Sequence, residues 1–520
     1  MPGQKGKKRL AAGWPGTWST VYAESLTAKT LSLFQTTLGH SYFLGWLSPA
    51  VALPANPRPS GNSYWERAGR RLGGLAKQTC SGWSKRFHQL AATSWFIQQS
   101  LRAGGVFLLG QPAWSLYLVV GYVLFDYFIR QFPGTSWLAG VWDELLFFSI
   151  IGLWAVGSLW DGNPHYRPSA LGWPIMVFVS VSTFLLLVVS PQFNIAFEGW
   201  RVVVEYILWY FVGLNLLSSR GQAKGLMITF LILGTVLALH GIYQYAIGVE
   251  IPSSWIDSQH ETAVRTRAFS ILGSPNVLGS LFVLIIPMGL ALFLSEKEKA
   301  RQLLYLTSLG LLSVCLLFTF SRGAWLSLAG ALVFFGLRQD RRVIVLLLLV
   351  IIATPAIFPS ASERLAFLTT PEFRASSEAG GRLARWEISL DRWERHPYTG
   401  LGLGRFGGAV ANRHEETRWF YTDNYYLKTA TEMGLIGLTA FLWLLLNCLR
   451  AGSQAIARLR DPYWQLLGVG ILAGLIGVLL HNTVENIFEV PALTTYFWFW
   501  LGILVGLGQL DHDRVGNVKA

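Results

Sequence analysis

The residues of this chain best suited to chemistry are arginines that border apolar segments. Arg322 lies in the stretch TFSRGAW, between two segments apolar enough to be membrane helices. A guanidinium stays charged inside proteins, and insertion scales assign it a cost of about 2.5–3.5 kcal/mol near the membrane centre. Arg265 and Arg267 precede another apolar segment, and residues 360–422 hold nine arginines and no lysine. The arginines are thus concentrated at the ends of predicted membrane helices.

Such arginines indicate a binding site for an anion. A guanidinium donates two parallel hydrogen bonds to a carboxylate or phosphate, whereas lysine presents a single point charge. The sequence therefore predicts a phosphate-bearing or acidic ligand at a membrane surface. Fixed arginines also stabilise negative charge as it develops, which predicts chemistry that needs no metal ion or cofactor. The D-x-D motif at 511–513 is expected to be a solvated part of the C-terminal tail.

Membrane helices must position these arginines. The chain is 52% hydrophobic and 14% charged, and its mean hydropathy of +0.40 excludes an ordinary soluble protein. Segments long enough to span a membrane lie at about 110–131, 137–160, 170–190, 198–217, 225–248, 272–295, 302–320, 324–337, 343–359, 424–448, 463–484 and 492–509. The predicted fold class is an all-α polytopic membrane protein with about 12 transmembrane helices.

The short loops on one side of this predicted bundle are basic. They lie near residues 220–224, 297–301, 338–342 and 450–460. The positive-inside rule makes this side cytoplasmic and places both termini there, including the tail at 511–520. The net charge of +13 suits contact with anionic membrane lipids, and nucleic-acid binding is not predicted.

The N-terminal residues 1–104 form a separate basic region. They contain no apolar run of membrane length and interleave lysines and arginines with tryptophans. We expect this region to be cytoplasmic, and to be partly disordered or to lie on the membrane surface. A role in binding a partner stays open.

Residues 360–422 are predicted to form one long extracytoplasmic loop. Apolar residues recur at helical spacing within it and predict an amphipathic helix over 382–395. Those residues are Leu383, Trp386, Leu390 and Trp393. The glycines at 400–404 predict a tight turn, and the loop is expected to pack over the bundle as a lid or a cavity wall. Gly434 and Gly437 in the next helix are expected to allow close helix packing.

Four outward-facing stretches combine arginines, glycines and amides. They are R-x-F-x-x-x-G-x-P-N at 267–276, S-R-G-x-W at 321–325, R-L-x-x-W…H-P-x-x-G-x-G-x-G at 382–404, and N-x9-G-x-x-G from Asn424. In this order the chain resembles the O-antigen ligase and O-antigen polymerase family of bacterial membrane glycosyltransferases, over residues 110–509. The family typically has histidine before that asparagine, whereas this chain has Asp423.

The resemblance implies a GT-C-like helical bundle over residues 105–510, in the bacterial cytoplasmic (inner) membrane. It implies inverting transfer of a glycan from undecaprenyl pyrophosphate to an acceptor hydroxyl on the outer face. The expected partners are this lipid-linked donor, membrane lipids, and a glycan, lipid or protein acceptor. Ligase and polymerase activities, and the identity of the sugar, stay open.

Specific residues suit the roles that the resemblance implies. The candidate catalytic residues are Asp423, Asn424, Arg322 and Arg382. Asp423 would orient or deprotonate the acceptor hydroxyl beside Asn424, while the arginines hold the pyrophosphate. The candidate substrate-binding residues are Arg265, Arg267, Asn276, Arg385, Trp386 and Glu205.

Structural interpretations compete with several of these roles. Asp423 could be the N-cap of the helix that follows it, and Asn276 could help to open its own helix. Glu205 could form an ion pair with Arg201, one helical turn earlier. Arg322 could extend toward water from a helix end, and the tryptophans could pack rather than stack on sugars.

Two other functions stay open from the sequence. Proteins that resemble this family have been labelled inorganic-carbon transporters, and a bicarbonate path would also use arginines. Such a path would not require an outer loop as long as residues 360–422. A non-catalytic assembly subunit, with residues 1–104 as its docking part, is the third possibility.

Overall fold

The computed structural model describes residues 112–132, 137–161, 166–252, 266–357, 381–417 and 421–518, with isolated positions at 134, 363, 366, 369–371 and 377–378. The described residues form helices and connecting turns, with no strand among them. The N-terminal region 1–104, Arg265 and most of residues 358–380 lie outside the described residues.

The helices before residue 220 are short or interrupted. They are α7 (Ser115–Val120), α8 (Tyr122–Gln131), α9 (Trp142–Asp161), α10 (Gly172–Val188), α11 (Phe193–Val204), the 3₁₀ turn η4 (Glu205–Leu208) and α12 (Trp209–Leu216). The segment predicted as a span at 198–217 is therefore helical but not one regular α-helix. The chain tightens into a 3₁₀ turn at Glu205, whose carboxylate pairs with Arg201 at 3.1 Å. The predicted span at 110–131 is likewise divided at Gly121, a residue that weakens helices.

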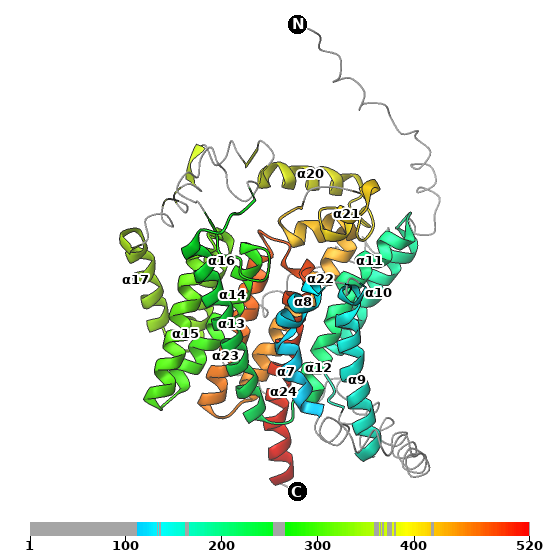
Figure 1. Ribbon diagram of the computed structural model, residues 1–520. Helices are drawn as coiled ribbons and strands as arrows, with labels where there is room; N and C mark the ends of the chain where they lie inside the picture. The colour runs from blue at the N-terminus through cyan, green and yellow to red at the C-terminus, as the bar shows by residue number, and fades with distance from the viewer. Residues whose placement is uncertain are drawn as a thin grey trace, which may run out of the picture. The chain divides into compact units, whose positions relative to one another are not determined.

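Longer helices occupy the rest of the chain. They are α13 (Arg220–Ile247), α14 (Pro275–Ser295), α15 (Lys299–Phe318), α16 (Arg322–Arg338), α17 (Arg342–Ile357), α20 (Arg382–Arg395), α21 (Ala409–Arg413), α22 (Tyr425–Arg458), α23 (Pro462–His481) and α24 (Pro491–Val518). The amphipathic helix predicted over 382–395 is confirmed as α20. In Figure 1, α20 lies across the ends of the upright helices.

The long apolar helices are the candidate membrane spans. In the described part of the chain, six helices are long and apolar enough to span: α13, α14, α15, α22, α23 and the first twenty residues of α24. Gly172–Val188 and Arg342–Ala356 are shorter apolar helices. This is the architecture of a multi-pass membrane protein, and the number of twelve spans stays a prediction.

Helices α14, α16 and α23 pack against one another and carry the outer ends that matter for function. Small residues allow the close approach. A side-chain carbon at Gly474 of α23 would lie 2.4 Å from the carbonyl oxygen of Leu284 in α14. At Gly323, the second residue of α16, it would lie 3.0 Å from Nε2 of His481. The start of α16 is therefore held directly against the end of α23.

Helix α22 is broken at Gly434, which has φ +63° and ψ −168°. The expectation of simple helix packing at this glycine is wrong. The break frees backbone donors, and Leu435 N and Ile436 N donate instead to the carbonyls of Pro397 and Tyr398 at 2.8 and 3.1 Å. A side chain at Gly434 would collide with the backbone of Tyr398. The glycine-rich turn after α20 is thereby joined to the membrane helix.

The orientation can be tested by cysteine labelling of intact cells. Glu394 is exposed on α20, and Lys299 is exposed at the first residue of α15, in the basic stretch that follows the end of α14. In a chain whose own cysteines are replaced, a membrane-impermeant maleimide should label Glu394→Cys and spare Lys299→Cys, because basic short loops stay cytoplasmic. Permeabilised cells should show labelling of both. The reverse pattern in intact cells would invert the topology.

Candidate functional site

Strained backbone marks three segments at the ends of helices. Ser270, Phe320 and Asp423 have φ values of +51°, +50° and +52°, in the left-handed region that non-glycine residues rarely adopt. They precede α14, α16 and α22; Ser270 lies within one of the stretches that the sequence analysis selects, and Phe320 and Asp423 each lie directly before another. Such conformations cost about 1–3 kcal/mol each, persist only where the surroundings impose them, and cluster at functional sites.

Arg267 joins the first two of these segments. It is buried, and its Nε donates to the carbonyl oxygen of Thr319 at 2.8 Å. Its Nη2 donates to Oδ1 of Asn276 at 3.3 Å. The backbone follows the same path, since Ala268 N donates to Phe318 O at 2.8 Å. Arg267 therefore supports the site from beneath, through contacts with the protein itself.

Glu485 stands at the centre of the polar cluster. Asn276 Nδ2 donates to its Oε1, and Arg382 Nη2 donates to the same oxygen at 2.8 Å. Glu485 lies in the turn after α23, whereas Arg382 is the first residue of α20. The contact joins the outer helix to the membrane bundle.

Glu485 is a residue that the sequence interpretation missed. It follows the predicted span at 463–484 in the short polar run HNTVEN, which resembles an ordinary connecting turn. One signal was available: this turn lies on the same predicted outer side as the arginines, so its carboxylate had cationic neighbours to pair with.

Asp423 forms the second carboxylate of the cluster. Its Oδ2 lies 2.7 Å from Nη1 of Arg385 and 3.7 Å from Nε of Arg382. It is not the N-cap of α22, because Asn424 is, and Asn424 Oδ1 accepts a hydrogen bond from Leu427 N at 3.0 Å. The structure thus gives the capping role to Asn424 and directs the Asp423 carboxylate to the arginines.

Burial governs the protonation of the two carboxyls. Burial raises the pKa of Glu485 to about 7; Arg382 opposes the rise and the nearby Asp423 adds to it. Burial also raises the pKa of Asp423, against the opposing effects of Arg382 and Arg385. A carboxylate whose pKa lies near 7 is suited to accept a proton at neutral pH.

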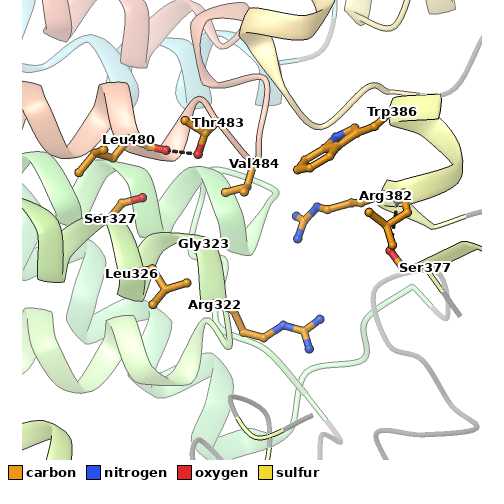
Figure 2. Close-up of a pocket in the computed structure, with 11 residues that line it drawn as sticks. Arg322, Gly323, Leu326, Ser327, Ser377, Arg382, Trp386, Leu480, Thr483 and Val484 are labelled. Carbon is orange, nitrogen blue, oxygen red and sulfur yellow. Dashed lines mark hydrogen bonds between the residues drawn. The ribbon is translucent and has the colours of Figure 1, made fainter. Parts of the chain in front are cut away.

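A cavity of 370 Å³ opens beside the cluster, between α16, α20 and the end of α23. Figure 2 shows Arg322 and Arg382 extending into this space from α16 and α20, with Trp386 above. Trp386 also donates from Nε1 to the carbonyl oxygen of Thr422 at 3.1 Å, so it both packs and lines the cavity. Leu326 and Leu480 form part of an apolar wall.

Glu205 belongs to a different cluster. It pairs with Arg201, as the structural interpretation expected, and Arg201 also pairs with Glu144 of α9. The structure thus brings together Arg267, Asn276, Arg322, Arg382, Arg385, Trp386, Asp423 and Asn424 at one end of the bundle, and places Glu205 with other partners. Arg265 lies outside the described residues. Among the described residues, no group of three His, Cys, Asp or Glu side chains is placed to hold a metal ion.

Comparison with protein families confirms the resemblance over part of the chain. Residues 307–442 match the O-antigen ligase family. The matched stretch runs from α15 into α22 and includes Arg322, Arg382 and Asp423, whereas Arg267 and Glu485 lie outside it. A search of curated proteins found no match. This family of membrane glycan ligases and polymerases is therefore what residues 307–442, about a quarter of the chain, are similar to.

The electrostatic arrangement can be tested by isotope-edited infrared titration of Glu485. Because Arg382 favours the ionised form, Arg382→Gln should shift the pKa of Glu485 upward from about 7. Arg395→Gln provides a matched control on the same helix, since Arg395 pairs with Asp391 at the exposed surface. An identical titration curve for Glu485 in the Arg382 variant and the wild type would contradict the claim that Arg382 stabilises the ionised form of Glu485.

Proposed function

We propose that this protein transfers a glycan from undecaprenyl pyrophosphate to an acceptor hydroxyl at the outer face of the bacterial cytoplasmic membrane. One observation carries the proposal: a cavity with two arginines and an apolar wall adjoins a pair of carboxyls that share one of those arginines. The family match at 307–442 supports glycan transfer, in a chain with helices of membrane-spanning length.

The polar end of the cavity suits a pyrophosphate. Arg322 and Gly323 are the first residues of α16, so the N-terminal end of this helix, which favours anions, lies at the cavity. Arg382 contributes a second guanidinium from α20. Its five N–H donors allow one guanidinium to serve a carboxylate and a phosphate together. Two fixed cations and a helix N-terminus can stabilise the charge of a departing pyrophosphate.

The apolar wall suits the lipid part of the donor. Leu326 is 59% exposed and Leu480 is 40% exposed, on helices that lie within the membrane bundle. Leu480 packs over Gly330, one turn below Leu326 on α16. A polyprenyl chain in the surrounding lipid would meet these side chains as its pyrophosphate reached Arg322 and Arg382. The cavity therefore combines the two chemistries of a lipid-linked donor.

The reaction follows from this arrangement. The acceptor oxygen bonds to the anomeric carbon on the side opposite the leaving group, and the bond from that carbon to the pyrophosphate oxygen breaks. The bonding electrons leave with the pyrophosphate on its carrier lipid, and the arginines hold that anion. The acceptor proton passes to the Asp423–Glu485 pair, directly or through water. The anomeric configuration is inverted, and the proposed scheme assigns no step to a metal ion.

Reconstitution with a lipid-linked oligosaccharide tests the function. Purified protein should convert the donor into free carrier pyrophosphate and an enlarged acceptor glycan. Arg322→Lys and Arg382→Lys should each lower the rate about tenfold or more although charge is kept, because the two-pronged geometry is lost. Arg395→Lys, at the exposed end of α20, should match the wild type. Bicarbonate uptake into vesicles without glycan transfer would instead support the transporter alternative.

The pH dependence tests the carboxyl pair. A general base acts when deprotonated, so kcat/KM should rise as pH increases through about 7 and be lost below it. Glu485→Gln should remove this ionisation, and Glu485→Gln and Asp423→Asn should each lower the rate about a hundredfold at equal folded protein. Glu394→Gln, exposed on α20, is the control. If both carboxyl variants kept the wild-type pH profile, neither carboxyl would act as the base, and only the arginines would take part in the reaction.

A further inference from the structure

Asn486 lies between the two segments that carry the carboxyls. It directly follows Glu485 in the chain, and its Oδ1 accepts a hydrogen bond from Asn424 N at 3.1 Å, next to Asp423. Its Nδ2 donates to Gly407 O at 2.7 Å and reaches Glu489 Oε2 at 3.3 Å. Asn486 is only 7% exposed, so its amide is committed to these contacts inside the protein.

Gly407 completes the link to the Asp423 segment. Its carbonyl oxygen accepts from Asn486 Nδ2 and also from Thr422 N at 3.0 Å. Hydrogen bonds therefore hold the residues on both sides of Asp423. Thr422 bonds to Gly407, and Asn424 bonds to Asn486 itself. The left-handed backbone of Asp423 requires such support, because it is strained without it.

Asn486 is in turn held by a buried network of charged side chains. Glu489 lies between Asn486 and Lys428, whose Nζ is 3.2 Å from Glu489 Oε1. Lys428 also pairs with Glu432, one turn further along α22. Backbone donors complete the network, since Ala409 N donates to Glu489 Oε2 at 3.1 Å and Phe406 N donates to Glu432 Oε1 at 2.9 Å. Breaking such a buried network is costly, which makes it a rigid anchor.

We infer that Asn486 is a positioning residue, which fixes the segment of Asp423 against the segment of Glu485 and so sets the geometry of the carboxyl pair that Arg382 bridges. The inference rests on the proposed function for its kinetic consequence, although the restraint itself is independent of any activity. Asn486 acts through the two carboxyls.

Hydrogen exchange measures the restraint without reference to activity. Asn486→Ala removes the acceptor for Asn424 N, so a peptide covering residues 421–425 should exchange faster than in the wild type. Peptides from α14 should be unchanged. Asn412→Ala is the matched control, because Asn412 also donates to this glycine-rich loop, to Gly408 O at 3.0 Å, without touching the Asp423 segment. Unchanged exchange at 421–425 would overturn the inference.

Kinetics measure the consequence for the carboxyl pair. Asn486→Ala should lower kcat about tenfold or more and displace the pH profile, with the donor KM nearly unchanged, because geometry is altered while the arginines remain. Asn412→Ala should change neither. Faster exchange with wild-type kcat and pH profile would overturn a positioning role. Wild-type protein that transfers no glycan would refute the proposed function. The exchange result would still show whether Asn486 restrains residues 421–425.

Asn486→Asp tests the hydrogen bond from position 486 to Gly407 while side-chain size is nearly kept. It replaces the alanine variant if that variant does not fold. Aspartate keeps the acceptor for Asn424 N at nearly the same size, and it can donate to Gly407 O only when protonated. The rate of Asn486→Asp relative to the wild type at the same pH should therefore rise as pH falls. A ratio independent of pH, in a folded variant, would overturn the role of the donated hydrogen bond.

Discussion

The structure at the outer end of the bundle depends on one guanidinium, that of Arg382. It is the first residue of α20 and contacts both Glu485, after α23, and Asp423, before α22. Two carboxylates so close together and only 17% and 15% exposed repel each other, and leaving Glu485 without its cation would cost several kcal/mol. The arginine resolves this conflict only if α20 lies across the ends of the membrane helices. The charges of the site are therefore balanced only when the amphipathic helix α20 lies in this position.

A second constraint keeps the outer segments from moving independently of the membrane helices. The backbone of α22 opens at Gly434 and bonds to Pro397 and Tyr398, and the buried Lys428 bonds to Glu489 across the glycine-rich turn. Gly407 has φ +64°, and a side chain there would meet Thr422. The glycines at 400–404, which predicted a tight turn from the sequence, are likewise sites of close backbone approach. They make the outer segment a fixed wall of the cavity.

The sequence predicted what depends on local pattern. Helical periodicity located α20 to the residue, and arginines next to glycines located the two cationic side chains of the cavity, Arg322 and Arg382. It did not reveal Glu485, because the burial of that side chain is created by α20, about a hundred residues earlier in the chain. The break at Gly434 was missed for the same reason: its partners lie in a distant turn. Asn424 and Asp423 are adjacent and both can cap a helix, so only the backbone geometry assigned the cap.

The departure at position 423 from the histidine typical of the resembled family has a physical rationale in the neighbouring charges. A histidine beside Arg382 and Arg385 would be kept neutral by like-charge repulsion and could act as a base alone. An aspartate there pairs with the same arginines, which oppose the rise that burial causes in its pKa. Glu485 shares Arg382, and burial raises its pKa to about 7, with the nearby negative charge of Asp423 adding to the rise. Burial thus raises the pKa of both carboxyls while Arg382 opposes the rise, so the pair can hold the arginines in place and is suited to accept a proton near neutral pH.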